Sequence, residues 1–550
     1  MNNVLTLDNF SRIAVEHFVQ TVVFVDDKIY ASPPNGTVIG EKKASSPKAR
    51  KPATKSAEEQ ISNKSDGVSE IQAEVSSFSP HDIQASFAEK SIVCSLHQPI
   101  KDEPVGIGSV TYKLCASADI VIIDWDLYGD SGKYAKNLIE NLVLQSLKED
   151  PHQLRLVLIY TDNPSLFDIA DQISEKLIAK IADGIKHKNE DKGLAFHTLN
   201  ARVVVLGKPA NRLDEFKSFE VQEAELADRA VSEFCKLADG MLQSGILMGL
   251  ATIRKQSRKI LTKFHAGLDA AFLTHRALSQ PHEEAFDHIA SLLVSEIQAI
   301  LEDSLESPLF PEAVVQDWCN KREFGKYAQS SAQGADFKAF AYDFCRFGSG
   351  AREKHRFTSA PSNKQLPTLL LPDKEKSNPP EPDMSSMEQL AVLMSHRTHY
   401  DNQRRFLRLG TILRERSGKK RFLLCLQPVC DSTRLTGSNP FLFCYMDEST
   451  TKVTHIVPDS NDFCELLLNP CKENRTIINF SANHKKRVTA KKGANTEYLF
   501  SDDMTSGGMK NEYQWIAQLK VEHAQRAAEQ FARELGRVGL TESEWLRSKS

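Results

Sequence analysis

The sequence lacks the features of a membrane or secreted protein. No apolar run in its 550 residues approaches the roughly 20 residues needed to cross a bilayer. The start, residues 1–5, has no basic stretch followed by an apolar core, so we expect no secretory signal. Its ten cysteines are scattered without a Cys-x-x-Cys pair, which excludes zinc-finger spacing and favours reduced core thiols. These absences predict a cytoplasmic protein with no membrane partner.

The sequence also lacks an excess of one charge. It has 69 Lys and Arg against 73 Asp and Glu, a net charge of −4, so it has no general attraction to nucleic acid. The densest basic cluster, residues 484–487 with Lys491 and Lys492, has no interleaved aromatic side chains on which bases could stack. Helix-turn-helix, winged-helix, cyclase and phosphodiesterase signatures are not found. We therefore expect no nucleic-acid partner.

The most informative stretch is an apolar run that ends in carboxylates and glycines. Residues 120–123 are Ile or Val, and they are followed by Asp124, Asp126, Gly129 and Gly132. A short run rich in Val and Ile is typical of a parallel strand buried on both faces. In open α/β sheets, the carboxyl ends of such strands hold the functional residues. The run therefore predicts a strand that presents Asp124 at a functional edge.

Three other runs end in polar residues in the same way. Residues 21–25 lead into Asp26 and Asp27, residues 156–160 lead into Thr161, and residues 202–206 lead into Lys208. If these strands are parallel, their ends converge at one edge of the sheet. Three carboxylates at close range require a neutralising cation, and oxygen ligands suit Mg²⁺. The pattern predicts a magnesium site.

This order of residues resembles the receiver domain of two-component response regulators. The resemblance covers residues 1–212 and implies that Asp124 accepts a phosphoryl group from a sensor histidine kinase. It also implies that Asp26, Asp27 and Asp124 hold Mg²⁺, and that Thr161 and Lys208 contact the phosphoryl oxygens.

The resemblance extends to the loop after Asp124. The main-chain carbonyl of Asp126 is the implied fourth metal ligand, and Tyr128 stands where the family usually has proline. Two further positions depart from the family pattern. Val205 stands where an aromatic residue is frequent, and Asp162 follows the hydroxyl where a small residue is usual.

The implied fold class is α/β: a flavodoxin-like receiver with a parallel five-stranded sheet in the order 2-1-3-4-5. Apolar spacing predicts helices at residues 6–20, 81–90 and 134–148, and another after Pro164. Residues 91–96 supply the second strand. Residues 31–80 are rich in Ser, Lys, Pro and Glu, and we predict a disordered insertion there.

The remaining chain is predicted to form a helical region at 213–347, a linker at 348–388 and an α+β domain at 389–550. Apolar residues at spacings of three and four indicate the helices, which we expect to pair in a homodimer. The linker has Pro and Lys-Glu clusters. Residues 422–426, 440–445 and 452–457 are predicted strands, and residues 513–535 a long amphipathic helix. Trp545 follows near the end.

Two alternatives remain open for the function. The receiver could serve only as a docking fold for an interaction protein, without phosphorylation. Alternatively, Cys430 beside Asp431 could be a thiol nucleophile, with His455 or His484 as its base. The helical region also contains His265, His275, His282 and His288, which we interpret as surface or capping residues rather than phosphorelay sites.

The layout of the chain, with the neighbourhood of residues 427–435, is similar to large receiver proteins of Detocs-like bacterial phage-defence two-component systems. We accordingly predict a phosphoacceptor of a kinase rather than a stand-alone enzyme. Its role would be that of a regulator, or of a phosphate sink that competes with a second receiver protein.

Overall fold

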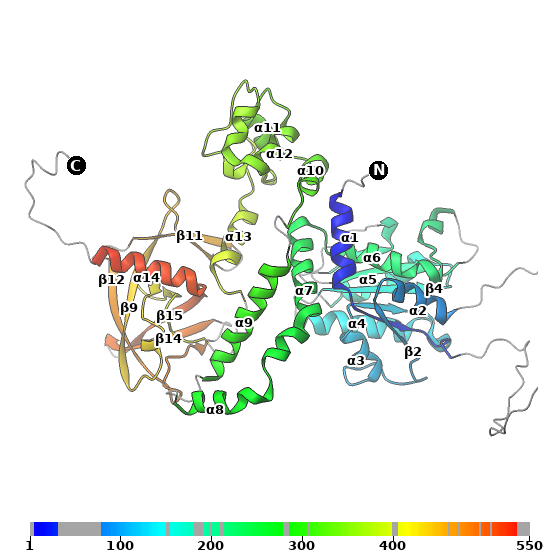
Figure 1. Ribbon diagram of the computed structural model, residues 1–550, viewed down its shortest axis with the longest axis horizontal. Helices are drawn as coiled ribbons and strands as arrows, with labels where there is room; N and C mark the ends of the chain where they lie inside the picture. Colours follow the sequence, from blue (N-terminus) through cyan, green and yellow to red (C-terminus); the bar gives the residue numbers. More distant parts are fainter. Residues whose placement is uncertain are drawn as a thin grey trace, which may run out of the picture. The chain divides into compact units, whose positions relative to one another are not determined.

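The computed structural model describes thirteen segments of the chain (Figure 1). They are residues 5–30, 79–149, 154–180, 191–198, 201–209, 214–278, 285–305, 309–398, 405–459, 462–469, 474–493, 497–506 and 509–535. The predicted disordered insertion, up to residue 78, and Trp545 lie outside them. The chain divides into two compact units, residues 1–264 with 293–320 and residues 265–292 with 321–550.

A six-stranded sheet forms the centre of the first unit. Its strand order is β2-β1-β3-β4-β6-β5, in which only the β5–β6 pair is antiparallel. The strands are β1 (Thr21–Val25), β2 (Val93–His97), β3 (Ile120–Ile123), β4 (Arg155–Thr161), β5 (Ala195–His197) and β6 (Ala201–Gly207). The α/β fold and the parallel order of the five predicted strands are confirmed, with β6 as the fifth.

The edge strand β5 was not predicted. It has only three residues, too few for either an alternating or a continuous apolar pattern to be distinguished from a loop. Strand β5 can pair with β6 only because the chain reverses direction between them, and no run of apolar residues indicates this reversal. By contrast, β3, β4 and β6 are buried along their whole length, as expected for strands covered on both faces.

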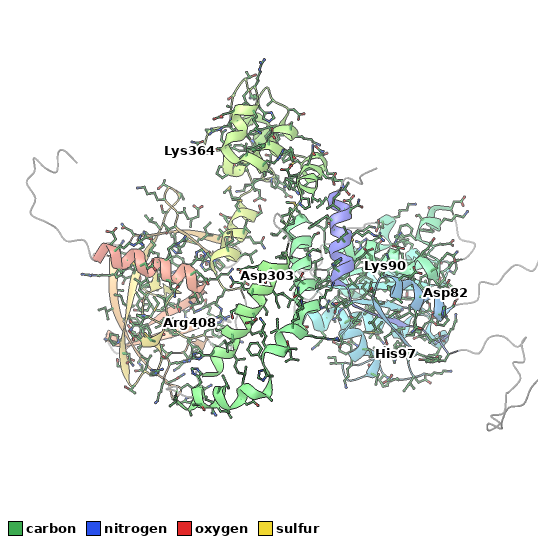
Figure 2. The ribbon with its side chains drawn as sticks, in the orientation of Figure 1. Asp82, Lys90, His97, Asp303, Lys364 and Arg408 are labelled. Carbon is green, nitrogen blue, oxygen red and sulfur yellow. The ribbon has the colours of Figure 1, made fainter. Side chains whose placement is uncertain are left out.

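Helices cover the sheet in two groups. One group is α1 (Leu7–Phe18), α2 (Pro80–Glu89) and α6 (Leu226–Leu237). Within it, α1 and α2 each contact α6. The other group is α3 (Val110–Ala116), α4 (Lys133–Glu149) and α5 (Leu166–Ile178). Lys90, labelled in Figure 2, joins the first group, because its Nζ lies 3.2 Å from Glu16 Oε1 and 2.8 Å from Asp228 Oδ1. The predicted helices at residues 6–20, 81–90 and 134–148 are confirmed, and so is a helix after Pro164.

Further helices complete the first unit. The long helix α7 (Met241–Lys263) packs along α1, where the hydroxyls of Ser11 and Ser244 form a buried hydrogen bond of 2.9 Å. Asp317, in α10 (Glu312–Lys321), accepts a 2.8 Å hydrogen bond from the backbone NH of Leu7. Figure 1 shows α1 and α7 side by side. The helix α9 (Ala285–Ser304) contributes to both units.

The second unit begins with short helices and a small core. These helices are α8 (Asp269–Leu278), α11 (Lys326–Ser331), α12 (Phe337–Phe347) and α13 (Ser385–Ser395). The buried side chains of Ala332, Phe340, Ala351, Leu366 and Leu369 form the core. Residues 351–369, within the segment predicted to be a linker, thus contribute three of the five buried side chains.

An antiparallel sheet dominates the rest of the second unit. Its order is β10-β11-β9-β8-β7-β15-β14-β13, and β12 also pairs with β9. The elements are β7 (Thr411–Glu415), β8 (Phe422–Cys425), β9 (Ser438–Glu448), β10 (His455–Asp459), β11 (Asp462–Leu468), β12 (Arg475–Ser481), β13 (Lys491–Lys492), β14 (Tyr498–Ser506), β15 (Met509–Gln518) and α14 (Val521–Leu535). Phe422 and Leu424 belong to the core on the α14 face, and Leu423 and Cys425 to the opposite core.

The predicted helix at residues 513–535 is wrong in its first part. Residues up to Gln518 belong to β15, and α14 begins at Val521. Tyr513 and Trp515 pack in one core while Ile516 packs in the other. Such alternation is typical of a strand covered on both faces. Because two cores make both sets of positions apolar, the sequence pattern resembles helical spacing.

Within the described residues, no helix combines the length and the apolar character that a membrane crossing requires.

Candidate functional site

The five residues predicted to form a site lie at the carboxyl ends of four strands. Asp26 and Asp27 follow β1, Asp124 follows β3, Thr161 ends β4, and Lys208 follows β6. Backbone hydrogen bonds continue the sheet into these positions. The NH of Asp124 donates to Val25 O at 2.9 Å, and the NH of Lys208 donates to Thr161 O at 2.7 Å. The backbone positions of these residues are therefore fixed by the sheet itself.

Three carboxylates converge at this edge. Oxygen atoms of Asp26, Asp27 and Asp124 all lie within 4.8 Å of one another, the one group of this kind in the described part of the chain. Asp26 and Asp124 are fully buried, and Asp27 is half-buried. So many acids at this separation repel one another unless a cation lies among them.

Asp124 is buried without hydrogen bonds. Neither carboxylate oxygen has a hydrogen-bond partner within the described structure. Burial raises the pKa of Asp124 to about 7; the positive charge of Lys208 opposes this rise, and the negative charge of Asp26 adds to it. Burying a carboxylate with two unsatisfied oxygens costs folding free energy. A ligand or a reaction at this carboxylate would satisfy these oxygens.

Lys208 supplies the nearest positive charge. Its Nζ lies 2.9 Å from Asp26 Oδ2 and 3.3 Å from Asp124 Oδ1. Burial works against the charged ammonium, but Asp124 and Asp26 outweigh it and raise the pKa of Lys208. Lys208 is therefore a fixed cation between two acids. Its Nζ also lies 5.7 Å from the centre of the Tyr160 ring.

Thr161 is fully buried at the end of β4. Its Oγ1 accepts a 3.2 Å hydrogen bond from the backbone NH of Asn163. The side chain thus closes the first turn of the loop that leads to α5. A threonine hydroxyl can both donate and accept hydrogen bonds.

The loop after Asp124 is held by its own side chains. Asp126 accepts a 2.8 Å hydrogen bond from the NH of Ser131, so its side chain stabilises the loop. That its main-chain carbonyl binds Mg²⁺ stays a prediction. Tyr128 has a positive φ of 58°, and its NH donates to Asp27 Oδ2 at 2.9 Å. Proline could adopt neither feature, since its ring fixes φ near −65° and it has no NH. Tyrosine at this position therefore fits the observed loop.

The donor set fits Mg²⁺. Asp27 Oδ1 and both oxygens of Asp124 are buried and accept no hydrogen bond within the described structure, so they are available as ligands. Mg²⁺ prefers hard oxygen ligands, and one or two carboxylates with water and phosphate oxygens are its usual set in proteins.

The other candidate residues are not brought into a comparable arrangement. Cys430 is exposed, and its Sγ lies 3.3 Å from Asp431 Oδ1. His455, in β10, contacts Thr454 Oγ1, and burial lowers its pKa to about 4. His275 and His288 lie 2.8 Å apart, ring nitrogen to ring nitrogen.

One charged residue at the site was not predicted. Lys28 follows the acidic pair directly, and its Nζ lies 3.3 Å from Asp162 Oδ2. The signal was present in the sequence as a Lys immediately after two acids, but only the sheet order shows that the loops carrying Lys28 and Asp162 meet.

Residues 18–213 match the family model of the response receiver domain. Neither the curated proteins nor the solved structures contain a match to the chain. The matched segment includes the six-stranded α/β sheet and every residue of the acidic site. Residues 18–213 of this chain therefore form a response receiver domain.

Proposed function

We propose that Asp124 is the phosphoacceptor of a two-component signalling protein. The observation that carries this proposal is the state of its carboxylate: buried, without hydrogen bonds in the described structure, and 3.3 Å from the fixed cation Lys208. A carboxylate held in this way is a nucleophile whose product would be stabilised by charges already in position.

The transfer is a displacement at phosphorus. One carboxylate oxygen of Asp124 forms the new P–O bond while the P–N bond of a kinase phosphohistidine breaks, and the bonding pair leaves with the imidazole. With a small donor such as acetyl phosphate, a P–O bond breaks and acetate leaves. Lys208 neutralises charge on the phosphoryl oxygens, and the Thr161 hydroxyl donates a hydrogen bond to one of them.

Asp26, Asp27 and Asp124, with the main-chain carbonyl of Asp126, are the proposed ligands of Mg²⁺. When bound, the ion supplies positive charge that offsets the repulsion between these acids and the phosphoryl oxygens. Asp26 additionally positions Lys208 through the 2.9 Å ion pair.

Intact mass measurement tests the proposal directly. The full chain, incubated with acetyl phosphate and Mg²⁺, should gain the mass of one phosphoryl group. A chain that remains unlabelled under these conditions, and also with a histidine kinase, would make the domain a docking fold instead.

We infer a histidine kinase as partner and a phage-defence signalling system as context, the latter from the resemblance of the chain's layout to Detocs-like proteins. Phosphoryl acceptance is itself the proposed role, in which the protein drains phosphate from a kinase that also serves a second receiver. Val205 supports a sink, because this fully buried side chain offers no aromatic ring to transmit a signal. In a mixture of kinase, second receiver and this chain, the second receiver should lose phosphate only if Asp124 is intact.

We also infer pairing of two copies through α7. Leu242, Ile246 and Leu250 follow one another at intervals of four residues and are 60%, 58% and 43% exposed, an apolar stripe on one face of the helix. Light scattering of the full chain tests this. Ile246→Asp should shift the mass toward the monomer, whereas Ile107→Asp, at a 53% exposed position in a loop, should not.

A further inference from the structure

Two further charged residues lie at the edge of the sheet that carries the acidic site. Lys28 is the third residue after β1, and Asp162 directly follows Thr161 in β4. Their side chains form an ion pair of 3.3 Å, with 47% and 57% of each side chain exposed. The strand order is β1-β3-β4, so this pair spans the carboxyl end of β3, which is where Asp124 begins its loop.

Both members of the pair act on Asp124. The pKa of Asp124 depends most on burial, on Lys208 and on Asp26. After these, Asp162 raises this pKa and Lys28 lowers it. The two charges are therefore near enough to Asp124 to influence it, and they do so in opposite directions.

The backbone of Lys28 is fixed while its side chain is not. The NH of Lys28 donates to Asp26 Oδ1 at 2.8 Å, and the next residue, Ile29, is buried. The ammonium, by contrast, ends a flexible four-carbon stem and is bound to a half-exposed partner. Lys28 can therefore exchange partners by side-chain rotation alone.

Phosphorylation changes the balance between the two possible partners of Lys28. A phosphoryl group carries roughly −1.5 to −2 charges, against −1 for the carboxylate of Asp162. The group would lie at the end of β3, beneath the ion pair. It attracts Lys28 more strongly than Asp162 does, and it repels Asp162.

We propose that Lys28 is a second phosphoryl ligand, held by Asp162 in the unmodified protein and transferred to the phosphoryl group when Asp124 is modified. This inference rests on the proposed phosphoacceptor function. The exchange releases Asp162 and with it the loop between β4 and α5, so phosphorylation alters this loop without the aromatic residue that Val205 replaces.

A double-mutant comparison separates a phosphoryl ligand from a mere partner of Asp162. The full chain and its K28Q, D162N and K28Q/D162N variants are incubated with acetyl phosphate and Mg²⁺, and labelling rates and phosphoryl lifetimes are measured by intact mass. D162N should label roughly two- to fivefold faster, the range for one partly screened charge contact. K28Q should label more slowly and lose its label sooner, and it should do so in the D162N background as well. K113Q and D168N, at exposed positions on α3 and α5, are the matched controls.

Hydrogen exchange of the segment 162–165 gives an independent reading. In the wild type, exchange should rise on labelling; in D162N it should be high beforehand and change little. If all proteins are labelled alike and K28Q has no effect in the D162N background, Lys28 is not a phosphoryl ligand, although the phosphoacceptor function stands. If the wild type gains no mass with acetyl phosphate and none with a histidine kinase, both proposals fail.

Discussion

The Nζ of Lys208 lies 3.3 Å from Oδ1 of Asp124, although the two residues follow strands that are not neighbours in the sheet. Strand β4 lies between β3 and β6, and the lysine side chain reaches across its end, where Thr161 is buried. One cation thereby contacts both the proposed nucleophile and Asp26, whose strand β1 adjoins β3 on its other edge.

The first prediction concerns the phosphoacceptor. Asp124→Asn should abolish labelling by acetyl phosphate, because the amide is not a nucleophile at this site. Asp126→Asn should retain labelling, since its side chain bonds to the NH of Ser131 and the proposed ligand is the main-chain carbonyl. Intact mass distinguishes the two. Labelling of the Asp124 variant together with loss in the Asp126 variant would reverse the assignment.

The second prediction concerns Lys208. Lys208→Ala should slow labelling by about 10²-fold or more, because charge stabilisation of a transferring phosphoryl group is lost. Lys217→Ala, which removes an exposed lysine from the same region of the chain, should leave the rate unchanged. The rates are measured by quenching and mass analysis. Equal rates for Lys208→Ala and the wild type would favour a docking fold.

The third prediction concerns Mg²⁺. The ion should stabilise the wild type against unfolding by about 1.4 kcal/mol at tenfold its dissociation constant, since it binds only the folded carboxylate cluster. Asp27→Asn should lose most of this stabilisation. Asp82→Asn, on the exposed first turn of α2 (labelled in Figure 2), should keep it. Thermal unfolding with and without Mg²⁺ provides the measurement, and equal shifts in both variants would exclude Asp27 as a ligand.

The fourth prediction tests the loop that follows Asp124. Gly132 has a φ of +79°, and a Cβ there would lie 2.2 Å from the Trp125 ring, so Gly132→Ala adds a clash to backbone strain. Gly129 has a similar φ of +76° but open space around it. Gly129→Ala should cost about 1 kcal/mol and Gly132→Ala about 1–3 kcal/mol more. Denaturant unfolding measures both, and equal costs would show that Trp125 does not restrict this position.

The fifth prediction is a pH dependence in the second unit. Burial lowers the pKa of His396 to about 4, and the charges of His455 and His523 add to the effect. The unfolded chain then binds more protons than the folded one between pH 6.5 and 4, so stability is full above pH 6.5 and is lost as the pH falls. The loss at pH 5 should be about 2 kcal/mol.

His396→Gln should reduce this pH dependence, because the substituted side chain does not titrate. Hydrogen exchange of the C-terminal sheet at pH 7.5 and pH 5, corrected for intrinsic rates, gives the measurement. A variant with an unchanged pH profile would assign the effect to other groups.

The receiver sheet and the convergence of five polar residues at one of its edges could be predicted from the order of residues alone. Runs such as residues 120–123 and 202–206 are apolar throughout because both faces of a parallel strand are buried, and a polar residue follows each run at the carboxyl edge of the sheet. The residues named in this way are Asp26, Asp27, Asp124, Thr161 and Lys208.

Which charges meet across strands could be learned only from the folded chain. The pairing of Lys28 with Asp162 depends on β3 lying between β1 and β4, and the approach of Lys208 to Asp124 depends on β4 lying between β3 and β6. The same holds for β15, where Trp515 and Ile516 belong to opposite cores. A local pattern reports whether a residue is buried but not which surface buries it, because that surface comes from segments distant in the chain.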